Sequence, residues 1–305
     1  MEQALKNFFL FMAKNKTFNR LAKKYGLALG ARRFVAGETL QDALGVVREL
    51  NDKGLMATVD HLGEFVLHEQ EANEMAEHCI AALEGMAREK LDCNLSLKLT
   101  SMGLDISKEL CLANMRRIMD VAQKLGIFVR IDMEDYAHLE DTLDIFKTLR
   151  QTYDNVGTVI QAYLYRSADD VEDLARLNSN LRLVKGAYKE SPEVAYPDKR
   201  DVDENFKKLI RLQLENGCYA AVATHDEEII EFTKQWVKEN NIANDRFEFQ
   251  MLYGIRSELQ LRLVEEGYRV RVYVPYGNDW YGYFMRRLAE RPANVAFVLK
   301  GMFKK

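Results

Sequence analysis

Two adjacent arginines near the C-terminal end of the sequence have the chemistry and the spacing to bind a carboxylate. Tyr283, Arg286, Arg287 and Glu290 fall at positions i, i+3, i+4 and i+7, so they share one face of two helical turns. Neighbouring guanidinium groups repel each other unless an anion bridges them, and their forked donors match a planar carboxylate. Glu290 can hold one of the arginines in place. The alternative is a surface ladder of ion pairs, which is common on helices.

A second set of polar residues stands at the ends of short apolar runs along the chain. A core strand gains nothing from ending in a lone charge, so the recurrence of such ends indicates one shared polar site. The residues are Asp60, His61, Lys98, Asp132, Glu134, Gln161, Arg182, Lys185, Thr224, His225, Asp226, Gln250 and Tyr273. A barrel of parallel strands brings their carboxyl ends to one face, where the active sites of such barrels lie.

Eight short apolar runs recur from residue 55 onward, and the segments between them are charged, with the spacing of amphipathic helices. The shortness of the runs and their content of Val, Ile, Tyr and Phe indicate strands. They are Leu55–Val59, Cys93–Leu99, Ile127–Ile131, Gly157–Ala162, Leu181–Val184, Tyr219–Ala223, Phe247–Leu252 and Arg269–Val274. Strands that alternate with helices form a parallel sheet, and eight such units close into a barrel.

We therefore predict an α/β fold in a single domain, a (β/α)8 TIM-type barrel of distorted shape. Residues 1–50 are expected to form an N-terminal helical arm and residues 51–305 the catalytic barrel, with the final helix over its C-terminal face. That position favours the carboxylate-binding interpretation of the arginine pair. An open doubly wound sheet is the alternative, disfavoured because no glycine-rich GxGxxG motif follows the first strand.

The composition is that of a chain able to bury a large core, because hydrophobic residues make up 48% of its 305 residues and charged residues 30%. This excludes a disordered chain, a collagen-like repeat and a multi-pass membrane protein. The net charge of −4 gives no reason to expect nucleic acid as a partner. The four cysteines form no CxxC motif and no secretory signature accompanies them, so we expect reduced thiols and a cytoplasmic protein.

The net charge is unevenly distributed. Residues 1–33 contain eight Lys or Arg residues and one acidic residue, Glu2, so this segment carries +7 and the rest of the chain −11. Its apolar residues recur with helical spacing, and residues 297–305 repeat the basic and apolar character. A basic amphipathic arm can lie on an anionic membrane surface, which predicts peripheral contact with the inner face of the cell membrane. The alternative is a solvated helix packed on the main domain.

Several short motifs occur in a specific order along the chain. They are Asp60–Glu64, Leu95–Leu99, Arg130–Glu134, Gln161–Tyr163, Arg182–Tyr188, Ala223–His225, Gln250–Gly254 and the helix that carries Tyr283 to Glu290. Over about residues 50–295 this series resembles the proline dehydrogenase family. The resemblance implies an FAD-dependent barrel that oxidises L-proline to 1-pyrroline-5-carboxylate, the first step of proline catabolism to glutamate, and passes the electrons to a quinone. Bifunctional members add an aldehyde dehydrogenase domain, for which this chain ends too soon, so a monofunctional enzyme is expected.

The resemblance also implies roles for individual residues. Lys98, Arg286 and Arg287 correspond to the residues that clamp the carboxylate of proline, and Glu290 belongs to the same helix. The wall of the proline pocket corresponds to Asp132, Leu183, Tyr188, Leu252, Tyr273 and Tyr283. The FAD contacts correspond to Val159, Gln161, Arg182, Lys185, Gly186, Ala187, Thr224, His225 and Gln250. In the family, the residue that corresponds to Arg182 lies near the flavin N5 atom, where a cation stabilises the charge that builds up on reduction.

A gate over the pocket is a further expectation. Glu64 follows the first predicted strand, and Arg287 comes from the helix after the eighth. These strands are neighbours in a closed barrel, so the two side chains are expected to pair above bound proline and exclude water, and the resemblance implies the same pairing. Gly63 and Gly282 would allow the movement. The alternative is an ordinary salt bridge at the rim with no role in turnover.

The chemistry implied is transfer of a hydride from C5 of proline to flavin N5. The amine of proline must be neutral in the reactive form, because a cation resists hydride loss, and the sequence assigns no base to remove its proton. We expect no metal, because His61, His138 and His225 lie on different segments without the spacing of a metal site. Two other hypotheses stay open: a Schiff-base aldolase with Lys98 or Lys185 as nucleophile, and a non-catalytic membrane-associated binding module.

Overall fold

The computed structural model describes residues 31–290, apart from the side chains of residues 31, 286 and 288–290. The predictions for residues 1–30 and 297–305 therefore lie outside the described residues. Within them, a closed barrel of parallel strands runs in the order β1 to β8, with β8 returning to pair with β1. The predicted TIM-type barrel is confirmed, and the alternative of an open sheet is wrong.

The strands lie where the apolar runs predict them. They are β1 (Met56–His61), β2 (Cys93–Lys98), β3 (Val129–Asp132), β4 (Val156–Gln161), β5 (Leu181–Val184), β6 (Ala220–Ala223), β7 (Phe247–Leu252) and β8 (Val270–Tyr276). Their register brings the carboxyl ends to one level. Lys98 stands opposite Asp132, and Asp60 stands opposite Pro275. The polar residues at the strand ends are thereby collected around one mouth of the barrel.

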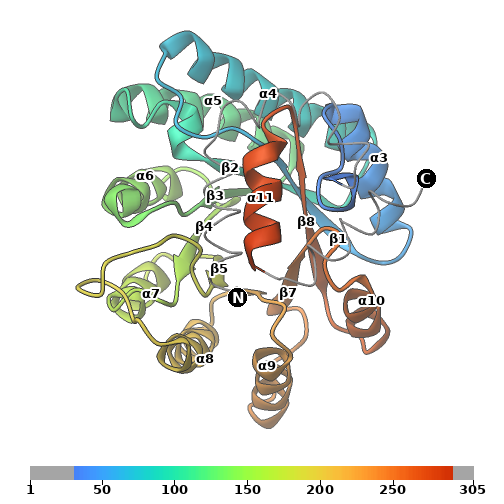
Figure 1. Cartoon of the computed structure of the whole chain (residues 1–305), viewed down its shortest axis with the longest axis vertical. Helices are drawn as coiled ribbons and strands as arrows, with labels where there is room; N and C mark the ends of the chain where they lie inside the picture. Colours follow the sequence, from blue (N-terminus) through green and yellow to red (C-terminus); the bar gives the residue numbers. More distant parts are fainter. Residues whose placement is uncertain (1–30, 291–305) are drawn as a thin grey trace.

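Helices alternate with the strands and surround them (Figure 1). They are α3 (Leu40–Asn51), α4 (Glu69–Arg88), α5 (Lys108–Leu125), α6 (Leu139–Arg150), α7 (Ser167–Ala175), α8 (Lys199–Glu215), α9 (Glu227–Glu239), α10 (Ser257–Glu265) and α11 (Trp280–Glu290), with short 3₁₀ turns η1 (Ala31–Arg33), η2 (Leu99–Met102) and η3 (Tyr136–His138). Helix α5 shows why these segments are helical: Ser107 caps its first turn, and Gly126 ends it in the left-handed conformation.

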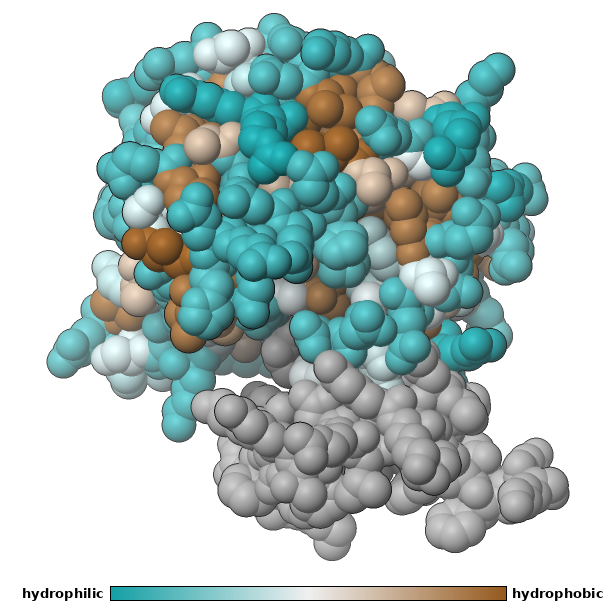
Figure 2. Space-filling model, turned by 90° about the horizontal axis from the view of Figure 1, so that it is seen from above, coloured by the Kyte–Doolittle hydropathy of each residue, from teal (hydrophilic) through white to brown (hydrophobic). Residues whose placement is uncertain are grey.

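The core lies between the outer faces of the strands and the inner faces of the helices. In α4 the buried residues Ala72, Ala76, Cys79 and Leu83 recur at spacings of three and four, which is one face of a helix. On the side of the molecule where α4 and α5 lie, hydrophilic side chains predominate and apolar ones form small separate patches (Figure 2). None of the helices in residues 31–290 is long and apolar enough to cross a membrane.

Helix α3, which falls within the predicted N-terminal arm, packs against β1 and β8. A capping box starts it: the Thr39 hydroxyl accepts from the Asp42 backbone, and the Asp42 carboxylate accepts from the Thr39 backbone. The preceding segment is tied to the end of β8, because the backbone N–H of Ala36 donates to the carbonyl of Pro275 at 2.9 Å. This part of the predicted arm is therefore built onto the barrel.

Helix α11 crosses in front of the ring of strands, over the carboxyl ends (Figure 1). Trp280, Tyr281 and Phe284 anchor it in a small apolar cluster of its own, together with Phe34, Val35, Leu62 and Ile255. The anchor fixes α11 to the loops after β1 and β7 and to the segment after η1. It leaves Tyr283 and Arg287 on the wall of the barrel mouth, so the predicted position of the final helix is confirmed.

Candidate active site

The interior of the barrel is unusually polar. Barrel interiors are ordinarily filled by layers of branched apolar side chains, but here Arg130, Glu248 and Arg271 are nearly fully buried along the strands. Closer to the carboxyl ends, Asp132 and Arg182 are 8% and 5% exposed. Buried charges are tolerated only where partners satisfy them, so the hydrogen bonds of this interior define the floor of the site.

Above this floor lies a cavity of about 660 Å³ at the carboxyl ends of the strands. That volume is within the range of small-molecule and cofactor sites. The cavity is lined by Asp60, Glu64, Lys98, Asp132, Met133, Val159, Gln161, Arg182, Val184, Lys185, Gly186, Ala187, Tyr188, Ala223, Thr224, His225, Asp226, Glu227, Gln250, Met251, Leu252, Arg256, Tyr273, Tyr283 and Arg287. The structure thus brings together residues that are up to 227 positions apart, from Asp60 to Arg287.

Asp132 is the hub of the floor. Its Oδ1 accepts from Nη1 of Arg182 at 2.5 Å and from the hydroxyl of Ser96 at 2.8 Å. Its Oδ2 accepts from the hydroxyl of Tyr273 at 2.9 Å. Both oxygens of this buried carboxylate are therefore satisfied, and each bond holds one neighbour in a fixed orientation.

Lys98 lies between two carboxylates. Its Nζ donates to Oδ2 of Asp60 at 3.0 Å and lies 3.8 Å from Oδ2 of Asp132. Burial by itself lowers the pKa of Lys98, but Asp60, Asp132 and Glu64 more than offset this and raise it above its usual value. Lys98 is therefore a lasting cation, which disfavours Lys98 as the nucleophile of an aldolase because a Schiff base forms from a neutral amine.

Tyr273 bridges the same two carboxylates from β8. Its hydroxyl lies 2.6 Å from Oδ2 of Asp60, and the Arg182 guanidinium lies over its ring at 5.3 Å. Burial, followed by Asp132 and Asp60, raises the pKa of Tyr273 well above its usual value. The phenol stays protonated, and its single proton is shared between the carboxylates of Asp60 and Asp132.

Helix α11 contributes Tyr283 and Arg287 to the lining of the cavity. The Arg287 guanidinium lies over the ring of Tyr283 at 5.0 Å, an arrangement that holds the cation by its attraction to the aromatic face. Arg286 and Glu290 belong to the same helix, but their side chains lie outside the described part of the structure. Of the two predicted arginines, the structure therefore places only the side chain of Arg287 at the cavity.

The side of the cavity formed by β4 to β7 carries the second group of predicted residues. Lys185 forms ion pairs with Asp203 at 2.5 Å and Asp226 at 2.7 Å. His225 holds the end of β7, because its Nε2 accepts from the backbone N–H of Leu252 at 3.0 Å. The ring is therefore a neutral tautomer with its proton on Nδ1.

A glycine shapes the rim on this side. Gly186 has φ +119°, and a Cβ atom there would lie 2.4 Å from the ring of Tyr163. Any side chain at this position would force either the ring of Tyr163 or the loop that presents Lys185, Ala187 and Tyr188 to shift.

Not every residue that the sequence proposes lines the cavity. Leu183 is fully buried in the hydrophobic core, because its neighbours Arg182 and Val184 face inward and side chains alternate along a strand. His61 and Glu134 do not line the cavity either. The ring of His61 stacks on the ring of His78. The buried Glu134 accepts hydrogen bonds from the hydroxyl and the backbone N–H of Thr100.

Sequence reasoning left some residues of the wall unassigned, notably Met133, Val184 and Arg256. Alternation from Arg182 could have identified Val184, because residues two apart on a strand share a face. The sequence marks Asp60 only as the polar end of a strand, and the folded structure reveals its contacts with Lys98 and Tyr273.

The residues of the β4 to β7 side could hold a large cofactor. Oε1 of Gln161 is buried at the cavity and accepts no hydrogen bond from any residue that the structure describes. Arg182, Lys185 and Arg256 supply cations, Thr224 supplies a hydroxyl, and Val159 and Val184 supply apolar surface. Such a combination fits a planar group with an anionic tail.

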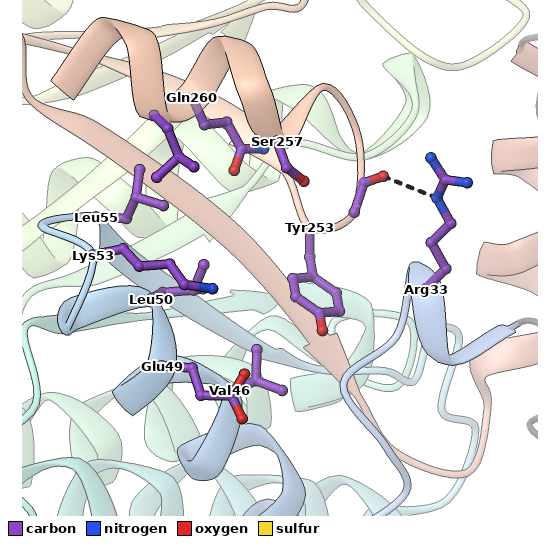
Figure 3. Close-up of a pocket in the computed structure, with 11 residues that line it drawn as sticks. Arg33, Val46, Glu49, Leu50, Lys53, Leu55, Tyr253, Ser257 and Gln260 are labelled. Atoms are coloured by element: carbon purple, nitrogen blue, oxygen red, sulfur yellow. Dashed lines mark hydrogen bonds between the residues drawn. The ribbon is translucent and has the colours of Figure 1, made fainter. Parts of the chain in front are cut away.

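A second, smaller hollow of about 320 Å³ lies outside the barrel between α3 and α10 (Figure 3). It contains none of the predicted site residues. Nε of Arg33 donates to the carbonyl of Gly254 at 3.4 Å, and a Cβ atom on Gly254 would lie 1.7 Å from the carbonyl oxygen of Arg33. The glycine therefore permits close contact between η1 and the loop after β7, which gives this hollow a structural explanation.

Comparison with known proteins decides the family. A sequence model described as proline dehydrogenase matches residues 43–300. The chain belongs to the proline dehydrogenase family. Proline dehydrogenase 1 of Bacillus subtilis (strain 168) is 58% identical over 301 residues, which cover 99% of this chain and 100% of that protein. Proline dehydrogenase of Deinococcus radiodurans is 44% identical over 309 residues, which cover 100% of this chain and 99% of that protein.

A solved structure agrees with this assignment to the proline dehydrogenase family. Proline utilization A (PutA) from Bdellovibrio bacteriovorus, inactivated by N-propargylglycine, matches 94% of this chain with a TM-score of 0.82 and 28% identity. The match covers 35% of the PutA chain, so the present chain spans about a third of that larger protein. The resemblance to the proline dehydrogenase family predicted from the motifs is therefore confirmed.

Proposed function

We propose that the chain is an FAD-dependent proline dehydrogenase, which oxidises L-proline to 1-pyrroline-5-carboxylate and passes the electrons to a quinone. The observation that carries the proposal is the division of one cavity between two sides. Residues expected to meet the substrate come mainly from β2, β3, β8 and α11, whereas those expected to meet the cofactor come from β4 to β7 and the loops after them. A closed barrel holds these two groups face to face.

The substrate side suits a small zwitterion with a carboxylate. Arg287 from α11 and Lys98 from β2 are cations on the wall of the same cavity, and Arg286 is expected to join them from the next position of the helix. Leu252, Tyr188 and Tyr283 supply the apolar and aromatic wall around the ring of proline. An apolar wall also favours the neutral amine over the ammonium, because burial disfavours the charged form.

FAD would supply the acceptor for the hydride that leaves C5 of proline. The residues proposed to contact this group are Val159 and Gln161 on β4, Lys185, Gly186 and Ala187 after β5, Thr224 and His225 after β6, and Gln250 on β7. Arg182 is a fixed cation, held by Asp132 and Gln250. Placed beside the reacting atoms, it would stabilise negative charge that develops as the hydride arrives.

The first test of the proposal is the visible spectrum of the purified protein. We expect a yellow protein with the absorbance bands of an oxidised flavin. Heat denaturation should release the flavin, because the contacts proposed are non-covalent, and chromatography should identify it as FAD. A colourless protein that takes up no added FAD would contradict the cofactor assignment.

The gate over the pocket gives a prediction for Glu64. Glu64 and Arg287 line the same cavity, from the loop after β1 and the helix after β8, and those two strands are paired. Glu64→Ala should slow the anaerobic reduction of flavin by saturating L-proline, because water is no longer excluded. The free energy of unfolding should change by only about 0–1 kcal/mol, as for an exposed ion pair. If the rate constant of flavin reduction in Glu64→Ala equals that of the parent, Glu64 and Arg287 form an ordinary salt bridge at the rim with no role in turnover.

The contact with a membrane follows from the basic segment 1–33 and from the proposed quinone partner. We expect the protein to sediment with vesicles that contain anionic lipids and to be released by salt, because surface attraction is screened. A chain that lacks residues 1–33 should sediment less. Equal sedimentation of both chains, with equal melting temperatures, would assign the segment a purely structural role.

A further inference from the structure

A buried ion pair beneath the active site connects to it through one amide. Glu248 on β7 and Arg271 on β8 are 2% and 5% exposed, and Nε of Arg271 donates to Oε1 of Glu248 at 2.8 Å. The same oxygen accepts from Nε2 of Gln250 at 2.5 Å. Two residues along the strand from Glu248, Gln250 lies on the wall of the cavity.

The amide of Gln250 faces opposite charges at its two ends. Its Oε1 accepts from Nε of Arg182 at 2.5 Å, while its Nε2 donates to the carboxylate of Glu248. An amide has nearly the same shape when it is rotated by half a turn, so shape alone does not choose its orientation. The reversed amide would direct an N–H group at the guanidinium and a carbonyl at the carboxylate, and both contacts would be repulsive.

Glu248 therefore selects one orientation, provided that it is charged. Burial by itself raises the pKa of Glu248, but Arg271, together with hydrogen bonds from Gln250 and Tyr219, lowers it below its usual value. The carboxylate is therefore ionised at neutral pH. Its second oxygen, Oε2, accepts from the hydroxyl of Tyr219 at 3.0 Å and takes no part in the contact with Gln250.

We propose that Glu248 is a positioning residue, which fixes the amide of Gln250 and through it the guanidinium of Arg182 at the floor of the active site. Arg182 then has three acceptors in fixed directions, Asp132 and Ser96 at Nη1 and Gln250 at Nε. The positioning of Arg182 concerns hydrogen bonds within the protein itself. Its effect on the cofactor rests on the proposed function, so the positioning and the effect are measured separately.

The variant that removes the acceptor while it spares the fold is Glu248→Met combined with Arg271→Met. Replacing both members of a buried ion pair by apolar residues of similar length is often neutral for stability, whereas removing one member leaves an uncompensated charge. The net charge is also unchanged, so a through-space effect on the cofactor is nearly cancelled. Tyr219→Phe is the matched control, because it removes a hydrogen bond to Oε2 and leaves the bond between Oε1 and Gln250.

The first measurement uses cofactor-free protein and does not depend on the proposed function. The Nε–H of Arg182 should give a distinct arginine side-chain resonance in a ¹H–¹⁵N spectrum, assigned by its loss in Arg182→Met. The double variant should shift this resonance or broaden it beyond detection, and Tyr219→Phe should leave it in place. If the double variant folds with the resonance unchanged, Glu248 does not position Arg182.

The second measurement is the reduction potential of the bound flavin. An unpositioned Arg182 stabilises the reduced cofactor less, so the double variant should show a more negative potential, with an equilibrium constant for two-electron reduction about tenfold smaller, or about 30 mV. A merely structural role for Glu248 would lower the melting temperature and leave the potential unchanged. A parent protein that binds no flavin would defeat the proposed function alone, since the resonance of Arg182 still tests the role of Glu248.

Discussion

Replacing Arg182 by methionine is expected to slow the reduction of the bound flavin by L-proline by about 10²–10³-fold. This is the loss that typically follows the removal of one fixed donor from a site where charge develops in the transition state. The rate constant of flavin reduction at saturating L-proline, measured anaerobically by stopped flow, isolates this step from the later transfer of electrons to an acceptor.

The fold should survive this substitution. Asp132 keeps its bonds from Ser96 at 2.8 Å and Tyr273 at 2.9 Å, with Lys98 at 3.8 Å, so no bare carboxylate is left in the barrel. Arg182→Lys serves as the control for charge: it keeps the cation but cannot reach Asp132 and Gln250 together, and its loss should be smaller. A methionine variant that reduces its flavin at the parental rate would exclude Arg182 from the chemical step.

Replacing Arg287 by lysine is expected to weaken the binding of L-proline. A point charge cannot reproduce the two-pronged contact of a guanidinium with a carboxylate, and a charged hydrogen bond contributes about 1.5–3 kcal/mol. The Michaelis constant for L-proline should therefore rise by about 10- to 100-fold, with each factor of ten equal to about 1.4 kcal/mol. Bound flavin should change little, because Arg287 is not among the residues proposed to contact FAD.

The same substitution at Arg286 should act in the same direction. Arg176→Lys is a suitable control, because Arg176 lies at the end of α7, with its side chain 81% exposed, and is not among the residues that line the cavity. An unaltered Michaelis constant in Arg287→Lys would mean that the carboxylate of proline is held elsewhere in the site.

The sequence was sufficient to predict the barrel because the information is local and repeated. Each strand carries its own apolar run, and the predicted runs Leu181–Val184 and Phe247–Leu252 coincide with β5 and β7. The ends of the strands were predicted less accurately, because the run Ile127–Ile131 begins two residues before β3 (Val129–Asp132). Polar residues at successive strand ends predict a common site because the register of a parallel barrel is tightly constrained.

The contacts inside the barrel could not be predicted in the same way. Arg130, Glu248 and Arg271 alternate with apolar residues, a pattern that in a single strand is typical of a solvent-exposed face. Only closure of the barrel turns that face into a buried interior. The partners come from other strands, so the bond between Asp132 and Arg182 joins residues fifty positions apart.

The measurement that tests the central claim most directly is an anaerobic titration of the purified protein with L-proline, followed by visible absorbance. We predict that L-proline bleaches the flavin bands completely and that 1-pyrroline-5-carboxylate forms in a one-to-one ratio with the flavin reduced. A bound flavin that stays oxidised at saturating L-proline, although dithionite reduces it, would contradict the proposed function.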